Sequence, residues 1–331
     1  MASQEPGGST VKPAVERPLF TVAGKTYRWA DVILAAQLRG DWEELQHRAA
    51  QGLACLRRLT ASGEELDGNT LTDAEMSFRR DRNLLAGEET IEWLERRELT
   101  VGEWRDHLRR ALLRERWVDE LDETSARFPA AEDEVAAVIW AEAVCSGFLE
   151  QAAWRLAGDA ALAVEAGETL AGEPEHALPR IAAAADRLRA EGAAEEALER
   201  EVASHGLDWL RVDAELLELP TEDMAREVAF CVRDDRRPLA EVAADCGAEP
   251  RPLRIYIGEA GPELVPSLLG ADEGELVGPL DWNDGFALVL VESKARPTAA
   301  DPEVRRKAEA AVVRRITERA IAANVSWHEL V

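Results

Sequence analysis

Apolar side chains recur every three or four positions along most of the first two hundred residues, and this spacing is typical of amphipathic helices. Residues 19–29 differ, because apolar and polar residues alternate there around a Gly-Lys pair, which predicts a small β-hairpin. Helical spacing then predicts one helix from Trp29 to the residue before Gly40 and another over residues 42–59. The chain therefore begins with a hairpin that leads into a helical region.

Two sequences of the form Thr-x-x-Glu predict capping boxes, one over residues 72–75 and one over residues 100–103. Apolar and aromatic residues follow both at helical spacing, so residues 72–121 are expected to be helical with breaks. Three tryptophans share this spacing and are expected to pack in the core, with a ligand-facing role as the alternative: Trp93, Trp104 and Trp117.

Residues 131–200 are rich in alanine and almost free of strand signals. They predict helices over residues 134–156 and 181–198, separated by a looser stretch over residues 167–179. Alanine-rich faces allow helices to pack closely, and this region shows no chemistry of its own.

After Gly206 the pattern changes to short strands between helices, which predicts a compact α+β unit of roughly ninety residues. The expected strands are residues 209–219, 253–257, 275–280 and 286–291. The expected helices are residues 220–232 and 239–244, followed by a long helix over residues 302–323. The fold class that follows is α+β and mostly α.

The amino-acid composition limits the kinds of molecule that the protein is expected to bind. Of 331 residues, 46% are hydrophobic, so a sizeable core is available, and 65 acidic against 39 basic residues give a net charge of −26. This charge repels nucleic acid and anionic lipid, so neither is expected as a partner, whereas a polypeptide is permitted. No run approaches 18 apolar residues and residues 1–18 have no apolar leader, so we expect a flexible tail, no membrane span and a cytoplasmic protein.

The sequence holds no recognisable catalytic, cofactor or metal motif. It contains no G-x-S-x-G, P-loop or G-x-G-x-x-G sequence, and no two of the five histidines are three or four residues apart. The cysteines are far apart, so we expect buried, reduced thiols: Cys55, Cys145, Cys231 and Cys246. We therefore predict no catalytic residues, no cofactor and no metal.

Three segments of the α+β unit, in order and spacing, resemble the parvulin-type (PpiC) prolyl isomerase domain. They are the helix Leu239-Ala240-Glu241-Val242-Ala243, the segment Gly274-Glu275-Leu276-Val277-Gly278-Pro279-Leu280, and the turn and strand Asp284-Gly285-Phe286-Ala287-Leu288-Val289-Leu290-Val291. The resemblance covers residues 207–297 and implies a parvulin-like α+β domain.

The chain departs from the family at the two pocket histidines of active parvulins. One falls on Ala287 and the other within residues 214–217, where no histidine occurs. The resemblance therefore implies a degenerate domain that binds peptide without isomerase activity; the alternative is an active prolyl isomerase with an altered pocket. Candidates for the pocket wall are Tyr256, Trp282 and Phe286; alternatively, Phe286 belongs to the core and Trp282 caps a turn.

The preceding half resembles the helical lobe of SurA-like chaperones. The hairpin leads into the segment Tyr27-Arg28-Trp29-Ala30-Asp31-Val32, which is similar to the start of the first helix in that family. A second segment is similar to the peptide maturation proteins of ribosomal-peptide natural-product clusters, the crocagin-type group: Ile139-Trp140-Ala141-Glu142-Ala143-Val144-Cys145-Ser146-Gly147. This resemblance implies an accessory protein that holds a precursor peptide or its modifying enzyme during maturation. A subunit whose surface serves assembly only is a further possibility, and the oligomeric state stays open.

The resemblance also divides the chain. The expected segments are a tail (1–18), a hairpin and helical lobe (19–125), an alanine-rich helical segment (126–206), a parvulin-like domain (207–297), and a C-terminal helix that returns to the lobe (298–331).

Overall fold

The computed structural model describes residues 14–283 and 285–328 and divides the chain into two compact units. The first, which we call the helical unit, comprises Met1–Arg189 and Thr317–Val331; the second, the sheet unit, is Ala190–Ile316. The division therefore runs through the predicted alanine-rich segment and through the C-terminal helix. The other predicted boundaries stay predictions, and most of the expected tail, residues 1–13, lies outside the described residues.

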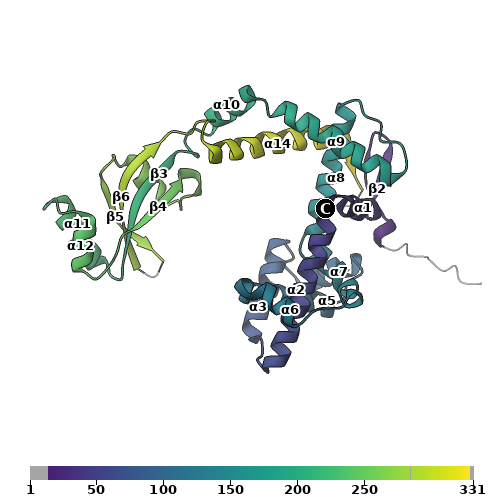
Figure 1. Ribbon diagram of the computed structural model, residues 1–331, viewed down its shortest axis with the longest axis horizontal. Helices are drawn as coiled ribbons and strands as arrows, with labels where there is room; N and C mark the ends of the chain where they lie inside the picture. Colours follow the sequence, from purple (N-terminus) through teal and green to yellow (C-terminus); the bar gives the residue numbers. More distant parts are fainter. Residues whose placement is uncertain (1–13, 284, 329–331) are drawn as a thin grey trace, which may run out of the picture. The chain divides into compact units, whose positions relative to one another are not determined.

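The helical unit is almost entirely helical (Figure 1). Its elements are η1 (Ala14–Glu16), β1 (Pro18–Val22), β2 (Lys25–Arg28), α1 (Trp29–Arg39), α2 (Asp41–Ser62), α3 (Gly68–Asp81), α4 (Gly87–Arg96), α5 (Val101–Arg116), η2 (Val118–Glu120), α6 (Leu121–Arg127), α7 (Glu132–Cys145), α8 (Phe148–Glu165), most of α9 (Pro174–Gly192), the end of α14 (Pro302–Asn324) and β7 (Val325–Trp327).

A small antiparallel sheet of order β2-β1-β7 lies at one end of this unit. The predicted hairpin supplies β1 and β2, whereas β7, which the sequence did not predict, comes from the end of the chain and pairs Trp327 with Phe20. The Phe20 ring centroid lies 4.9 Å from that of Tyr27 and 5.2 Å from that of Trp327. This aromatic contact explains how a strand of three residues is held in place.

Alanine determines how closely α8 packs. Ala153, Ala157 and Ala160 are fully buried in a core shared with the hairpin, α1 and α9. The predicted single helix over residues 134–156 is wrong, because Gly147 has a φ of +76° and separates α7 from α8. The helix predicted over residues 181–198 is likewise two helices, α9 and α10 (Glu195–Ser204).

A second core forms between α2, α3, α4, α5 and α7. The three tryptophans predicted to pack in the core are all buried: Trp93 and Trp104 lie within this core, and Trp117 lies in a small neighbouring cluster. The capping box at Thr100 is confirmed, since Thr100 caps α5 and the Glu103 carboxylate accepts from its backbone N–H. The box at Thr72 is wrong, because α3 already begins at Gly68 with Asp67 as its N-cap.

A buried ion cluster joins α5 to α7. The Glu142 carboxylate lies 2.9 Å from His107 Nδ1 and accepts a hydrogen bond of 2.6 Å from Arg110 Nε. Burial raises the pKa of Glu142, but its hydrogen bonds and its attraction to His107 and Arg110 outweigh burial, so the pKa lies below its usual range. The Arg110 side chain also lies so close to Gly52 that a Cβ at position 52 would be 2.9 Å from the Arg110 Cβ, so α2 and α5 pack closely at this point.

The sheet unit is built on a four-stranded antiparallel sheet of order β4-β3-β6-β5 (Figure 1). Its elements are α10, β3 (Arg211–Leu219), α11 (Glu222–Arg233), α12 (Leu239–Asp245), β4 (Arg251–Tyr256), η3 (Ile257–Glu259), α13 (Val265–Gly270), β5 (Leu276–Trp282), β6 (Gly285–Ala295) and the first part of α14. Each predicted strand and helix of this region is present, which confirms the mostly helical α+β class.

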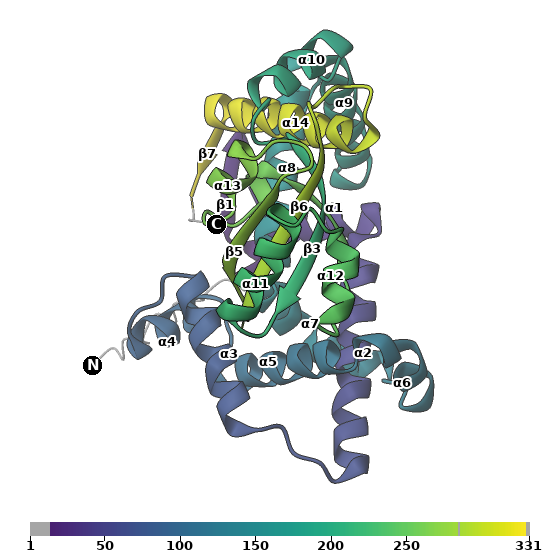
Figure 2. The ribbon, with the colours of Figure 1, turned by 90° about the vertical axis from the view of Figure 1, so that its left-hand side faces the viewer.

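The two faces of this sheet bury different side chains. Leu217, Leu219 and Leu288 face α11 and α12, whereas Ala214 and Leu216 belong to the core on the side of α13. Figure 2 shows α11, α12 and α13 around the strands. Both faces are thus apolar, as the alternation along β3 requires.

The cysteines follow the prediction only in part. Cys55 and Cys145 are buried, and burial raises the pKa of the Cys145 thiol to about 12. Cys231 is half-buried and Cys246, just after α12, is exposed.

Within the described ranges no single helix is long and apolar enough to cross a membrane. Only α7 and α8 taken together meet the length and composition, and they form a pair bent by 68°.

Candidate functional site

The three predicted pocket residues lie in the sheet unit, and Tyr256 is the most buried of them. Its side chain is 2% exposed and packs with Val304 of α14, and Lys307 Nζ lies 3.4 Å from its ring centroid. Burial, followed by the nearby Glu303 carboxylate, raises the pKa of the Tyr256 hydroxyl to about 12. Tyr256 is therefore a core residue under α14.

Trp282 and Phe286 pack on opposite faces of the sheet. Trp282 is half-buried on the α13 side, where its Nε1 donates to Glu218 Oε1 over 2.9 Å. Phe286 packs against the core beneath α11 and α12. This agrees with the alternative in which Phe286 belongs to the core.

The register along β3 shows that the three residues do not form one wall. Arg211 pairs with Tyr256 at the start of β3, and Leu219 pairs with Phe286 at its end. Eight residues of strand separate the two positions, which is about 26 Å. The three residues are thus spread over the sheet and do not line one wall in this structure, and a part for Tyr256, Trp282 or Phe286 in peptide binding stays a prediction.

The positions that correspond to the parvulin histidines are filled by small or apolar side chains. Ala287 is fully buried, and Ala214 and Leu216 are each 1% exposed. Gly278 lies so close that a Cβ there would be 2.6 Å from the Ala287 carbonyl oxygen. The nearby carboxylate of Glu218 is already held by Trp282 and by Arg251. The buried side chains at the described positions that correspond to the parvulin histidines are therefore alanine and leucine.

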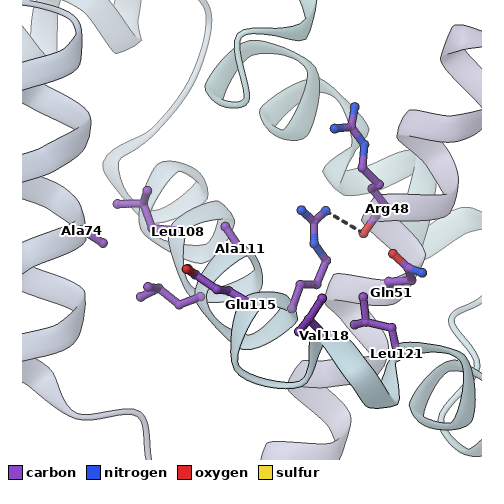
Figure 3. A pocket seen from close by; sticks show the side chains of 10 residues that line it. Arg48, Gln51, Ala74, Leu108, Ala111, Glu115, Val118 and Leu121 are labelled. Atoms are coloured by element: carbon purple, nitrogen blue, oxygen red, sulfur yellow. Dashed lines mark hydrogen bonds between the residues drawn. The ribbon is translucent and has the colours of Figure 1, made fainter. Parts of the chain in front are cut away.

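The helical unit, in contrast, has a hollow over α5. It has a volume of about 490 Å³ and lies between α2, α5 and the start of α6 (Figure 3). Its apolar floor is formed by residues that lie on one face of α5 because they are three and four positions apart: Leu108, Ala111 and Leu112. Val118, which is 62% exposed, lies at its rim.

A second hollow of about 510 Å³ lies over the same helix on the side of α3. The two hollows share Ala74, Leu108, Leu112 and Glu115, so they are two halves of one depression, which we call the α5 groove. Figure 3 shows Ala74 of α3 on one side of α5 and Arg48 and Gln51 of α2 on the other. Volumes of this size are in the range of ligand-binding clefts.

The charged residues at the rim of the α5 groove form no ion pair with one another or with any other residue that the structure describes. On the α3 side and on α5, Asp73, Asp81 and Glu115 are exposed and form no ion pair with any described residue. On the α2 side, Arg48 and Arg114 form no ion pair within residues 14–283 and 285–328 either, although Arg114 Nη1 donates to the Arg48 carbonyl over 3.2 Å. The groove thus has Asp73 and Asp81 on its α3 wall and Arg48 and Arg114 on its α2 side, and Glu115 of α5 lies next to both halves.

Arg82 lines the acidic half of the groove but is held in the protein core. Its guanidinium lies 3.8 Å from the Phe78 ring centroid and donates to the Cys145 carbonyl over 2.7 Å. Burial lowers its pKa. Arg82 therefore contacts Phe78 and Cys145, and it forms no ion pair with Asp73, Asp81 or Glu115 in the part of the chain that the structure describes.

A third hollow, of about 200 Å³, lies between α1, α8 and α9 and shows the opposite behaviour. Its charged groups pair with one another: Asp159 lies 2.7 Å from Arg189 and 3.5 Å from Arg39. Burial raises the pKa of Asp159 despite these cations. Because its charges are compensated internally, this hollow is a weaker candidate for a binding site.

The sequence did not reveal the α5 groove, although α3 carries a signal of it. The α3 positions that face α5 include small and polar residues, Ala74 and Ser77, where two packed helices would need larger apolar side chains.

Comparison with known proteins gives structural neighbours only. No protein-family model matches the chain, and no curated protein matches it. Its fold is similar to that of a SurA-like chaperone from Campylobacter jejuni, with 11% identity, a TM-score of 0.22, and 95% of this chain and 99% of that chain covered.

Two further solved structures are of the foldase protein PrsA. The one from Streptococcus pneumoniae is 11% identical with a TM-score of 0.28 and covers 93% of each chain. The one from Lactococcus lactis is 12% identical with a TM-score of 0.28, and the match covers 95% of this chain and 96% of that chain.

Proposed function

We propose that this protein is a non-catalytic, chaperone-like accessory protein that binds peptide in the α5 groove. The observation that carries the proposal is a hollow over α5 whose apolar floor includes the half-buried Ala111 and Leu112, within a rim of charges that form no ion pair among the described residues. An apolar floor exposed to water is unfavourable, and its burial under the apolar side chains of a ligand lowers the free energy of the complex. The resemblance of the chain to SurA-like proteins points to the same class of ligand.

The test is the affinity of the full-length protein for a labelled, unstructured peptide rich in apolar residues, measured by fluorescence anisotropy. Leu112→Glu places a charge on the groove floor and is expected to weaken binding at least about tenfold, which corresponds to 1.4 kcal/mol. Leu207→Glu is the matched control, because Leu207 is 57% exposed and lies in the sheet unit. Equal affinity of the two variants would overturn the assignment of the groove.

We further propose that the ligand is a precursor peptide, held in the cytoplasm during maturation of a ribosomally made natural product, or the enzyme that modifies that peptide. The support is the similarity of residues 139–147 to peptide maturation proteins of the crocagin-type group. Affinity capture from the native cell, with mild crosslinking and mass spectrometry, tests it. Enrichment of one short genome-encoded peptide or one modifying enzyme, lost in Leu112→Glu, is expected. A broad mixture of unfolded chains would contradict this role and leave a general chaperone.

A further inference from the structure

The two walls of the α5 groove carry opposite charges, and this restricts what the groove can hold. This inference rests on the proposed peptide binding and concerns the kind of peptide. Asp73 and Asp81 lie on α3, eight residues apart, which places their Cα atoms about 12 Å apart along one face of that helix. Arg48 and Arg114 lie on the opposite side of the floor.

These charges are unusual because they do not neutralise one another. The protein has an excess of acidic residues and many arginines in ion pairs, among them Arg57 with Glu134 and Arg105 with Glu75 close by in the helical unit. The groove nevertheless keeps carboxylates on one wall and guanidinium groups on the other without an ion pair between them. Their fields therefore add across the groove, and a ligand with the matching charges would be oriented by them.

The backbone of the walls determines the conformation of the ligand. Floor and walls are made mostly by α2, α3 and α5, whose backbone N–H and C=O groups are paired within each helix except at the ends, and Val118 of η2 and Leu121 of α6 complete the rim. None of the strands that the structure describes borders the groove, so it offers no described strand edge to which an extended peptide could add. A ligand here must satisfy its own backbone hydrogen bonds, and an amphipathic helix does so while it presents apolar side chains at spacings of three and four.

We infer that the α5 groove binds an amphipathic helical peptide with lysine or arginine along one flank, facing Asp73 and Asp81, and aspartate or glutamate along the other, facing Arg48 and Arg114. The apolar stripe of the peptide lies on the half-buried Ala111 and Leu112. The orientation of the bound helix is set by the order of these charges.

Two peptides of identical composition test this inference. Both carry the same apolar stripe at helical spacing, and the acidic and basic flanks are exchanged between them. Binding to the full chain is measured at low and at physiological salt. We expect the matched peptide to bind about tenfold more tightly at low salt, and the ratio to shrink as salt screens the charges.

Charge reversal in the protein completes the test. Asp73→Lys with Asp81→Lys and Arg48→Glu is expected to invert the preference between the two peptides. Asp234→Lys with Asp235→Lys is the control for the aspartate changes, because both residues are exposed in the sheet unit, and it is expected to leave the preference unchanged.

The outcomes separate this inference from the proposed function. If both peptides bind equally and Leu112→Glu weakens both, the groove binds peptide but the charge preference is overturned. If neither peptide binds the unmodified protein, both the inference and the proposed function are overturned. An inverted preference in the charge-reversed protein supports the inference.

Discussion

The α5 groove and the α13 face of the sheet are both apolar surfaces with charged residues at their margin, but only one of them has unsatisfied charges. On the sheet, Glu218 is held by Arg251 and Trp282, and the apolar positions around Ala287 are buried. In the groove, Leu112 is half-buried and Asp73, Asp81 and Arg48 form no ion pairs among the described residues. A surface that serves stability therefore has its charged side chains in ion pairs and its apolar side chains buried. A surface available to a ligand has charged side chains without ion pairs and apolar side chains that are partly exposed.

The largest expected effect concerns the support of the groove floor. Glu142→Ala leaves Arg110 and His107 buried without their carboxylate and is expected to destabilise the helical unit by about 3–5 kcal/mol. Urea unfolding followed by tryptophan fluorescence measures this. Glu64→Ala is the control, since its pair with Arg116 is exposed and contributes about 0–1 kcal/mol. Similar losses in the two variants would show that the buried cluster does not hold α5.

The next effect tests whether the sheet face has room for a catalytic group. Ala287→His inserts a ring where the alanine is fully buried and is expected to destabilise the sheet unit by about 1–3 kcal/mol. A coupled isomerisation assay with a proline peptide is expected to show no catalysis in this variant or in the unmodified protein. Measurable catalysis by the unmodified protein would favour the alternative of an isomerase with an altered pocket.

The pH dependence of stability should separate two buried acids of the helical unit. The folded-state pKa of Glu142 is lowered, so its stabilising contribution is present above its ordinary pKa of 4.5 and is lost as the pH falls through the lower folded value. The pKa of Asp159 is raised by burial, so Asp159 costs stability as the pH rises above 3.8.

These signs can be checked by urea unfolding of substituted proteins between pH 3 and 6. Glu142→Gln is expected to reduce the loss of stability on acidification, and Asp159→Asn is expected to increase it. The same change of slope in both variants would contradict the opposite signs.

The smallest expected effect is that of Trp282. Trp282→Ala removes the hydrogen bond to Glu218 and part of the sheet-face core, yet the affinity for the labelled peptide is expected to change less than about twofold, because the groove lies in the other unit. A larger loss, in a variant whose circular dichroism spectrum is unchanged, would give the sheet face a share in binding and confirm Trp282 as a binding residue.

The sequence predicted what depends on neighbouring residues. The hairpin around Gly24, the cap at Thr100 and the alternation along β3 are local signals, and the structure confirms them. It did not predict β7, because three residues form a strand only when Phe20, three hundred positions away, pairs with them. It assigned Tyr256 to a pocket because an aromatic residue beside a strand fits a pocket wall and a core equally well.

The α5 groove was missed for a related reason. Its floor residues Leu108 and Leu112 have the spacing of ordinary core residues, and Leu108 is buried in the core. Leu112 is only half-buried, because α3 carries the small residues Ala74 and Ser77 beside the groove. A sequence shows that a residue is apolar and which face it occupies. Whether a partner helix fills the space above it depends on tertiary contacts between separate segments.

Site-specific photocrosslinking tests the central claim most directly. A benzoylphenylalanine is placed at Val118 on the groove rim or at Phe230 on α11, two sites with nearly equal exposure, 62% and 59%. If the peptide binds in the α5 groove, irradiation with the labelled peptide is expected to give a crosslinked product from position 118 and little from position 230. Equal yields at the two positions, or a higher yield at position 230, would contradict peptide binding in the α5 groove.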